Sequence, residues 1–231
     1  MASPFFFEDT LPLSNEFIVS EDTSRHISQV LRMKEGEEII ITNGKGYTLN
    51  TIIIFADKKR TKVRITKKEF SERPLPPIAI AISLIKNNNR FEWLAEKATE
   101  IGVTTIIPLI CKRTEKAHFK KERTKSILIS AMLQSQQPWL PELQEPQKFL
   151  EVIKTENYDQ KFIAHCASEE KQELKDLVQK KTSKIILIGP EGDFTEEEIK
   201  AAIKNNYIAV SLGETRLRTE TAAIVAAAIL K

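Results

Sequence analysis

Three prolines within residues 74–77 are the feature that most limits how this chain can fold. Proline has no backbone N–H to donate and it fixes φ, so such a cluster cannot continue a helix or a central strand. The cluster is typical of a semi-rigid linker. We therefore expect two domains, residues 1–73 and 78–231, joined by residues 74–77.

Before the prolines, the pattern is that of short strands rich in Ile, Val, Phe and Tyr. Asn43-Gly44-Lys45-Gly46 separates two of them and is typical of a hairpin turn, because Asn and Gly accept positive φ at low cost. One helix is expected at Ser24–Met33, with Ile27, Val30 and Leu31 on one face. Several short strands in so few residues predict a small β-barrel. The expected strands are Phe17–Ser20, Glu38–Thr42, Tyr47–Phe55 and Lys62–Thr66.

Beyond the prolines, apolar runs of strand length alternate with amphipathic helices. Pro108 should sit at the end or edge of its strand, because it cannot donate to a neighbour. Thr195 and Glu198 form a capping box that begins one of the helices. This alternation predicts an α/β domain with a mainly parallel sheet, whose ligands collect beyond the carboxyl ends of the strands. The expected strands are Ile78–Leu84, Thr105–Ile110, Lys161–Cys166, Lys184–Ile188 and Tyr207–Leu212. The other expected helices are Arg90–Ile101, Arg123–Leu133, Glu170–Lys180 and Thr219–Leu230.

Composition excludes several classes of protein. The hydrophobic fraction of 41% and the charged fraction of 29% are ordinary for a globular chain, and no apolar run reaches the length of about eighteen residues that a membrane helix needs. We expect a cytoplasmic protein without a membrane partner. Cys111 and Cys166 form no metal-ligand spacing with each other or with the histidines, so we expect no metal. His165 and Cys166 are neighbours in a strand and point to opposite faces, which excludes a Cys–His pair.

Positive charge is concentrated in two places although the net charge is only +3. Residues 57–73 hold eight Lys or Arg against three acidic residues, and residues 112–125 hold seven against two. Such clusters suit a phosphate backbone, whose binding is largely electrostatic, and they favour a nucleic-acid partner. The alternative interpretation is two solvated faces.

Two loops combine glycine with charged residues at the ends of expected strands. They are Ile188–Phe194 and Leu212–Ala222. Glycine lets the backbone approach a ligand closely, and Arg218 with Glu220 places a cation and an anion beside a helix start. The pair indicates a ligand site, although the spacing does not name the ligand. The alternative is two tight turns, with Glu220 stabilising its helix N-terminus.

These two loops closely resemble the glycine-bearing motifs of the ribosomal RNA small subunit methyltransferase E family. That family belongs to the SPOUT class and methylates N3 of a uridine in 16S rRNA. His26–Met33 is similar to the family's N-terminal signature, and Phe91–Val103 is similar to its first catalytic-domain helix. The likeness therefore covers both expected domains, with the motifs in the family's order.

The resemblance implies properties that the pattern of residues does not show. The fold would be a PUA-like β-barrel domain followed by a SPOUT-type mainly parallel sheet with a C-terminal trefoil knot, which general topology rules exclude. The protein would be a homodimer that binds S-adenosylmethionine and acts on 16S rRNA in the small ribosomal subunit. The implied cofactor contacts are Leu84, Gly189, Pro190, Glu191, Gly192, Leu212, Gly213, Leu217, Arg218, Thr219 and Thr221.

Two positions depart from the family pattern. Asp193 stands where relatives usually have a second glycine. Gln134-Ser135-Gln136-Gln137 stands where they often have Gln-Ser-Gly-Arg, so one expected arginine contact is missing.

Methyl transfer to uracil N3 needs alignment of donor and acceptor and help with the N3 proton. Arg218 is the candidate for stabilising charge on the uracil carbonyl oxygens, and Glu220 is a candidate base or an orienter of Arg218. Arg32 and Arg113 are candidate RNA contacts, because a guanidinium matches phosphate geometry. For each of these residues, the alternative is a structural ion pair.

Two other functions stay open at this point. A SPOUT-type enzyme could methylate a ribose 2′-hydroxyl or another base, because the fold is shared across those reactions. The chain could also be a non-catalytic RNA-binding protein, although the glycines, Arg218 and Glu220 argue against that reading.

Overall fold

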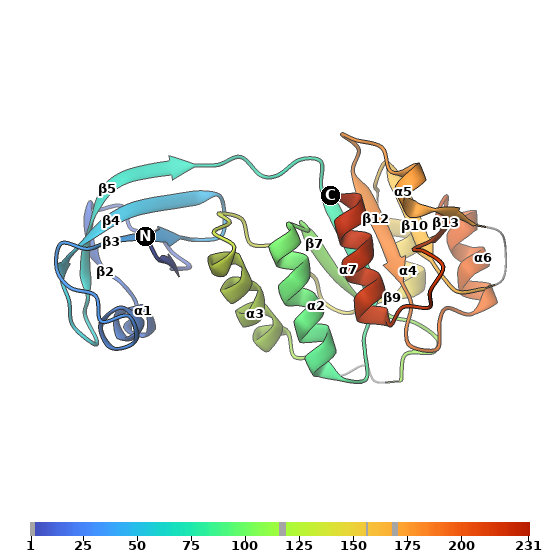
Figure 1. Cartoon of the computed structure of the whole chain (residues 1–231), viewed down its shortest axis with the longest axis horizontal. Helices are drawn as coiled ribbons and strands as arrows, with labels where there is room; N and C mark the ends of the chain where they lie inside the picture. The colour runs from blue at the N-terminus through green and yellow to red at the C-terminus, as the bar shows by residue number, and fades with distance from the viewer. Residues whose placement is uncertain (1–2, 116–118, 156, 168–170) are drawn as a thin grey trace. The chain divides into compact units, whose positions relative to one another are not determined.

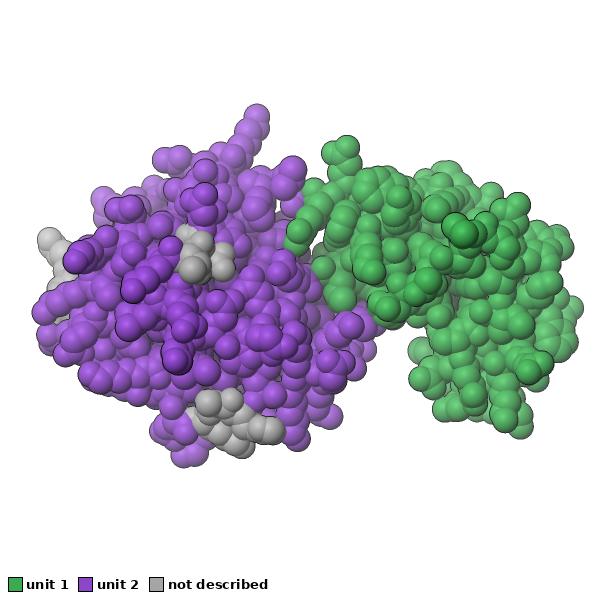
Figure 2. Space-filling model, turned by 180° about the vertical axis from the view of Figure 1, so that it is seen from behind, with its two compact units in different colours: residues 1–73, 132–140 green, residues 74–131, 141–231 purple. Residues whose placement is uncertain are grey.

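The computed structural model describes residues 3–115, 119–155, 157–167 and 171–231. The chain forms two compact units, coloured separately in Figure 2. The first unit contains residues 1–73 together with 132–140, and the second contains residues 74–131 and 141–231. The segment 132–140, which the sequence placed within the later domain, therefore belongs to the first unit.

The first unit is built on one five-stranded sheet in the order β1-β3-β4-β5-β2. Four of these strands, β2 to β5, are labelled in Figure 1. β1 pairs with β3 in parallel, and the other neighbours are antiparallel. The strands are β1 (Phe5–Phe7), β2 (Glu16–Ile18), β3 (Glu38–Thr42), β4 (Tyr47–Phe55) and β5 (Lys62–Phe70). The side chains that form its core are Phe6, Val19, Ile27, Ile39, Ile41, Leu49, Ile53 and Val63.

The single helix expected in this unit is two shorter segments, α1 (Glu21–Arg25) and the π-helical η1 (His26–Val30). Ser20 begins α1, because its hydroxyl accepts a hydrogen bond from the backbone of Thr23. Ile27 is fully buried, as expected, but Val30 and Leu31 are 66% and 43% exposed. The prediction of one apolar face was therefore wrong, because the wider π-turn rotates those two side chains out of the core.

The second unit contains a sheet in the order β11-β13-β10-β12-β6-β7-β8, with β9 also beside β7. All its paired strands are parallel. Its strands are β6 (Ile78–Ser83), β7 (Thr105–Ile110), β8 (Glu142–Leu143), β9 (Gln147–Lys148), β10 (Gln160–Ala164), β11 (Gln172–Glu173), β12 (Lys184–Ile188) and β13 (Ile208–Ser211).

Helices pack on both faces of this sheet. The helices are α2 (Asn88–Ile101), α3 (Lys121–Gln134), α4 (Phe149–Thr155), α5 (Leu174–Leu177), α6 (Glu196–Lys204) and α7 (Thr219–Leu230). Ala79 and Ala81 of β6 share a core with α4 and α6, whereas α7 packs against β6 and β12 beside α2 (Figure 1). Successive residues of a strand point to opposite faces of the sheet, so each strand contributes side chains to the packing on both faces. No described helix is long and apolar enough to span a membrane.

Two local expectations in this unit need correction. Between Glu170 and Lys180, only the one-turn helix α5 forms, preceded by β11, which pairs with β13; Glu170 itself lies outside the described residues. Pro108 lies inside β7, paired with Ile82, and not at its end, although it occupies a local edge, the other expected position. On the other side of β7, the pairing with β8 ends at Ile106 and the pairing with β9 begins at Leu109. The proline is tolerated because its missing N–H falls in that gap.

Candidate active site

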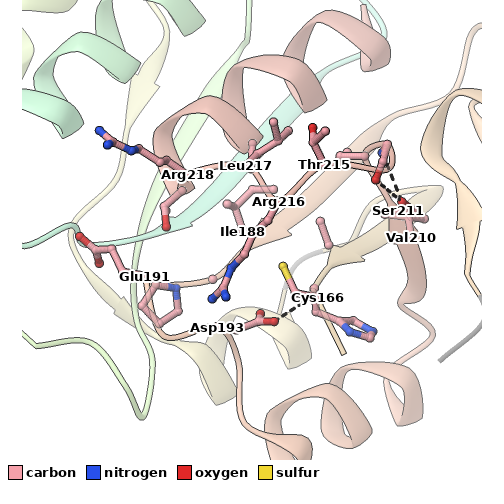
Figure 3. A pocket seen from close by; sticks show the side chains of 18 of the residues that line it. Cys166, Ile188, Glu191, Asp193, Val210, Ser211, Thr215, Arg216, Leu217 and Arg218 are labelled. Atoms are coloured by element: carbon pink, nitrogen blue, oxygen red, sulfur yellow. Dashed lines mark hydrogen bonds between the residues drawn. The ribbon is translucent and has the colours of Figure 1, made fainter. Parts of the chain in front are cut away.

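The site lies where three neighbouring parallel strands end. β13, β10 and β12 are adjacent in the sheet, so their carboxyl ends open on the same edge. After β13, the chain crosses over β10 to α7, which packs on β12 and β6. The connecting loop 212–218 therefore runs across these strand ends. A cavity of about 610 Å³ lies there (Figure 3). Its walls are Arg90, Ala164, His165, Cys166, Lys171, Ile188, Gly189, Pro190, Glu191, Asp193, Val210, Ser211, Leu212, Gly213, Glu214, Thr215, Arg216, Leu217, Arg218, Thr219 and Ala222.

The loop after β13 supplies the cationic side of the cavity. Gly213 has φ +121°, a conformation that L side chains rarely adopt, and its N–H donates to the hydroxyl of Ser211. Arg216 and Arg218 both line the cavity and are exposed. The side chain of Arg218 makes no ion pair or hydrogen bond with any residue that the structure describes. Its guanidinium is therefore free to meet a ligand.

The loop after β12 is tied to the end of β10 by Asp193. This residue has φ +63°, which explains why glycine suits the position, and Asp is among the few other residues that tolerate it. One carboxylate oxygen accepts a hydrogen bond from the backbone N–H of Cys166 at 2.7 Å, and the other accepts from Phe194 N–H at 2.7 Å. The aspartate that replaces the family's usual glycine therefore links the loop after β12 to the residues after β10, as the dashed line to Cys166 in Figure 3 shows.

Arg113 supports the same loop from outside the cavity. Its Nη1 donates to the carbonyl of Gly192 at 2.7 Å and to that of Phe194 at 3.4 Å. Glu198 completes the support, because its side chain closes the predicted capping box with Thr195 and accepts from the N–H of Lys112. The sequence missed this role of Arg113, and its contact with RNA stays a prediction.

Glu220 is buried behind this site, with a side chain that is only partly satisfied. The residue is 7% exposed, and its Oε1 lies 3.6 Å from Nε of Arg90. Its Oε2 has no hydrogen-bond partner among the described residues. Glu220 does not line the cavity, whereas Arg90 does. The partner of Glu220 in the structure is therefore Arg90, and its carboxylate makes no ion pair or hydrogen bond with Arg218.

The cavity gathers most, but not all, of the cofactor contacts implied by the resemblance. Leu84 is buried just after β6, Gly192 is exposed beside Arg113, and Thr221 is half-buried in the first turn of α7; none of them lines the cavity. Arg32 lies in the first unit, exposed and at φ +55°. The predicted contacts that do line it are Gly189, Pro190, Glu191, Leu212, Gly213, Leu217, Arg218 and Thr219.

The sequence missed the third wall, which comes from the end of β10 and the residues after it. The expected strand Lys161–Cys166 ends at Ala164, so His165 and Cys166 lie just after it. His165 is buried and Cys166 is exposed, and both line the cavity. Lys171 closes this wall, because its Nζ donates to the carbonyl of His165 at 2.8 Å. No local sequence signal marks this wall, because it depends on β10 lying between β13 and β12 in the sheet.

A second, more open cavity of about 520 Å³ shares Arg90 and Glu191 with the first. Its remaining walls are polar residues at the start of α2, where Asn87 caps the helix. Lys86 lies 2.8 Å from the Glu115 carboxylate, and this contact raises the pKa of the lysine.

By contrast, burial raises the pKa of the Cys111 thiol to about 12. Among the described residues, no three His, Cys, Asp or Glu side chains gather as a metal site.

Comparison with known proteins identifies the family. Residues 71–231 match the model of the RNA methyltransferase domain, and residues 19–66 match that of the RNA methyltransferase PUA domain. The ribosomal RNA small subunit methyltransferase E of Buchnera aphidicola subsp. Acyrthosiphon pisum is 30% identical, over 98% of this chain and 91% of its own length. The chain belongs to the ribosomal RNA small subunit methyltransferase E family.

Solved structures agree with this membership. A probable rRNA methyltransferase from Porphyromonas gingivalis is similar with a TM-score of 0.91 and 34% identity, over 97% of this chain and 95% of that one. A methyltransferase E from Neisseria gonorrhoeae, bound to S-adenosylmethionine, is similar with a TM-score of 0.87 and 28% identity, over 98% and 96% of the two chains. The predicted fold class, a PUA-like domain followed by a SPOUT-type α/β domain, is confirmed; the trefoil knot stays a prediction.

Proposed function

We propose that this protein transfers a methyl group from S-adenosylmethionine to N3 of a uridine in 16S rRNA of the small ribosomal subunit. The observation that carries the proposal is a cavity formed by the two glycine-bearing loops in a chain of this family. The match to a relative named ribosomal RNA small subunit methyltransferase E extends over nearly the whole chain, which supports methylation of small-subunit rRNA here.

The cavity fits S-adenosylmethionine in size and in chemistry. Its volume of about 610 Å³ lies within the ordinary range of small-molecule sites. Ile188, Leu212 and Leu217 offer apolar surface for the adenine, while Gly189 and Gly213 leave backbone groups open to the ligand. When bound, S-adenosylmethionine supplies an electrophilic methyl group on a sulfonium. The nearby carboxylates of Glu191, Asp193 and Glu214 would favour that positive charge.

Arg218 would act on the uracil. Because its side chain has no partner among the described residues, its guanidinium can donate to a carbonyl oxygen of the base as negative charge develops there. We propose that Glu220 is a positioning residue, which holds Arg90 at the wall shared by the two cavities. Its burial outside the cavity disfavours direct removal of the N3 proton. That proton would pass to water as the N3–methyl bond forms and the sulfur–methyl bond of S-adenosylmethionine breaks.

The RNA would approach by the second, polar cavity, where the asparagines at the start of α2 and Lys86 can bind nucleotide groups. Arg32 and the basic run within residues 57–73 of the first unit would bind phosphates, as would the cluster at 112–125, of which Lys116 lies outside the described residues. On this view, residues 1–73 provide RNA affinity, residues 78–231 provide catalysis, and residues 74–77 link them.

Three further properties belong to the proposal because the family resemblance implies them. The C-terminal part of the sheet would form the trefoil knot, and the enzyme would act as a homodimer with the cofactor beside the interface. Because its substrate would be ribosomal RNA, the protein would act in the cytoplasm.

Nucleoside analysis of 16S rRNA, with and without the gene, tests this function. We expect 3-methyluridine to disappear on deletion and to return when the gene is restored. Loss of a 2′-O-methylated nucleoside or of another methylated base would identify a related SPOUT reaction instead. Unchanged nucleosides, together with no calorimetric binding of S-adenosylmethionine, would identify a non-catalytic RNA-binding protein.

A further inference from the structure

Three aromatic side chains gather at one end of the β4–β5 pair, away from the core of the first unit. Tyr47 opens β4 and Phe70 closes β5, and the two are register partners, so their rings lie on the same face with centroids 4.8 Å apart. Trp139, from the segment 132–140, lies edge-on to Phe70 with centroids 6.3 Å apart. Phe70 is 55% exposed and Tyr47 is 37% exposed, so the cluster keeps much of its apolar surface in solvent.

The ring of Trp139 is held in place by the backbone around it. Its Nε1 donates to the carbonyl of Ser71 at 2.8 Å, and the backbone of Trp139 forms an isolated β-bridge with that of Lys45. The ring lies so close to Gly46 that a Cβ there would come within 2.6 Å of it, and Gly46 has φ +89°. Glycine is therefore needed at this position for two reasons. The aromatic surface is preorganised, and a partner would meet little loss of side-chain freedom.

Cations flank this surface. Nζ of Lys68 lies 4.9 Å from the centroid of the Tyr47 ring, and Cζ of Arg73 lies 5.9 Å from that of Trp139. The nearest acidic residue on β5, Glu69, follows Lys68 in the strand and therefore points to the opposite face, where it contacts Lys67 and Asn50. The face with the rings thus carries the positive charge.

We propose that Tyr47, Phe70 and Trp139, with Lys68 and Arg73, form a stacking surface for unpaired bases of the RNA substrate. Every base offers a flat face to an aromatic ring, and the adjoining cations suit the phosphates between bases. Bases inside a duplex are already stacked on each other, so this surface selects a single-stranded or unpaired segment. The inference rests on the proposed function, in which RNA is the substrate, and extends it to the structural class of RNA recognised outside the active site.

The test compares two exposed phenylalanines of the full chain. Phe70→Leu keeps an apolar side chain but removes the ring, and Phe55→Leu does the same at the other end of the strand pair. Phe55 is 51% exposed and makes no ring or cation contact among the described residues, so it is a matched control. Binding is measured by fluorescence anisotropy with a short labelled single-stranded RNA, and with the same strand annealed to its complement.

We expect Phe70→Leu to weaken single-stranded binding about tenfold, with little effect on the duplex or on S-adenosylmethionine binding. Phe55→Leu should match the parent protein. In a Trp93→Phe background, Trp139 is the only tryptophan, and single-stranded RNA should quench its fluorescence. Equal affinity of Phe70→Leu and parent protein, an equal loss in Phe55→Leu, or unquenched Trp139 would each overturn the proposal.

Methylation of small ribosomal subunits by the parent protein is measured in parallel. If the parent protein methylates subunits but has no affinity for single-stranded RNA, the stacking surface is refuted and the enzymatic function stands. The aromatic cluster would then serve a protein contact. If Phe70→Leu loses single-stranded affinity although the parent protein makes no methylated nucleoside, the surface stands and the enzymatic function fails.

Discussion

Cys111 and Cys166 occupy opposite environments, and the difference gives a direct probe of the cavity. Cys166 is exposed on the cavity wall, whereas Cys111 is buried with its thiol pKa raised to about 12. The thiolate is the reactive form, and a raised pKa keeps Cys111 protonated and inert at about pH 8. We therefore expect one equivalent of a thiol reagent to label the folded protein at Cys166, and S-adenosylmethionine to slow the reaction.

The control for this prediction is Cys166→Ala, which should abolish labelling in the native state and leave one reactive thiol after denaturation. A labelling rate that S-adenosylmethionine does not change would mean that the cofactor binds elsewhere.

The roles of Arg218 and Arg216 can be distinguished by replacing each arginine with lysine. Arg218→Lys keeps the charge but loses the planar pair of donors, so single-turnover methylation should fall about a hundredfold while cofactor binding changes little. Arg216→Lys, in the same loop and the same cavity, should have the smaller effect on turnover. A near-normal rate for Arg218→Lys would remove it from catalysis. A loss confined to affinity would make it a docking residue.

Asp193 has a left-handed backbone conformation and accepts two hydrogen bonds. Two substitutions measure separately how each feature affects stability. A left-handed conformation costs an ordinary L residue roughly 1–2 kcal/mol, and glycine avoids this cost. Asp193→Ala keeps the strain and loses both hydrogen bonds, so it should lower the free energy of unfolding by about 2 kcal/mol. The free energy of unfolding, measured by urea titration, should fall less in Asp193→Gly than in Asp193→Ala. Equal losses for Ala and Gly would contradict the assigned backbone strain.

At the scale of loops, the two glycines that the resemblance pairs together are not equivalent. Gly213 lines the cavity at φ +121°, whereas Gly192 lies outside it, and a Cβ there would make only ordinary contact with Arg113 at 3.5 Å. Gly213→Val should therefore weaken S-adenosylmethionine binding severely, and Gly192→Ala should have little effect in calorimetry. Comparable losses in both variants would show that the loop after β12 approaches the cofactor more closely than its geometry indicates.

The elements that could be predicted from the sequence are those whose signals are local. Thr195 with Glu198 marks the start of α6, because a capping box is read from four consecutive residues. Ser20 begins α1 by the same chemistry, but the expected helix was placed by apolar spacing alone and missed the π-turn at His26–Val30. β11 could not be predicted, because a two-residue strand is set by its pairing with β13 and has no periodicity of its own.

The same reasoning explains which walls of the site were found. The loops after β12 and β13 carry glycine beside charge, which is visible in the sequence. Cys166 and Lys171 become part of the site only because β10 lies between β13 and β12, and sheet order is a non-local property. Trp139 joins the first unit for a similar reason, through contacts with Gly46 and Ser71 that are distant in sequence.

At the scale of the whole molecule, the proposed function assigns substrate affinity to one unit and chemistry to the other. The first unit carries the basic run within residues 57–73 and the exposed aromatic cluster, and the second carries the cavity at the strand ends. An RNA methyltransferase needs both, because its cofactor is small and its substrate is a large polyanion. This division agrees with the match of the two regions to a PUA domain and a methyltransferase domain.

Methylation by the purified protein tests the central claim most directly. Small ribosomal subunits from a strain that lacks the gene are incubated with the protein and methyl-labelled S-adenosylmethionine, and the rRNA is digested to nucleosides. We predict that the label appears in 3-methyluridine at a single position of 16S rRNA. Label in a ribose-methylated nucleoside or another base would contradict the proposed reaction, and its absence from 16S rRNA under conditions where the cofactor binds would contradict the proposed substrate.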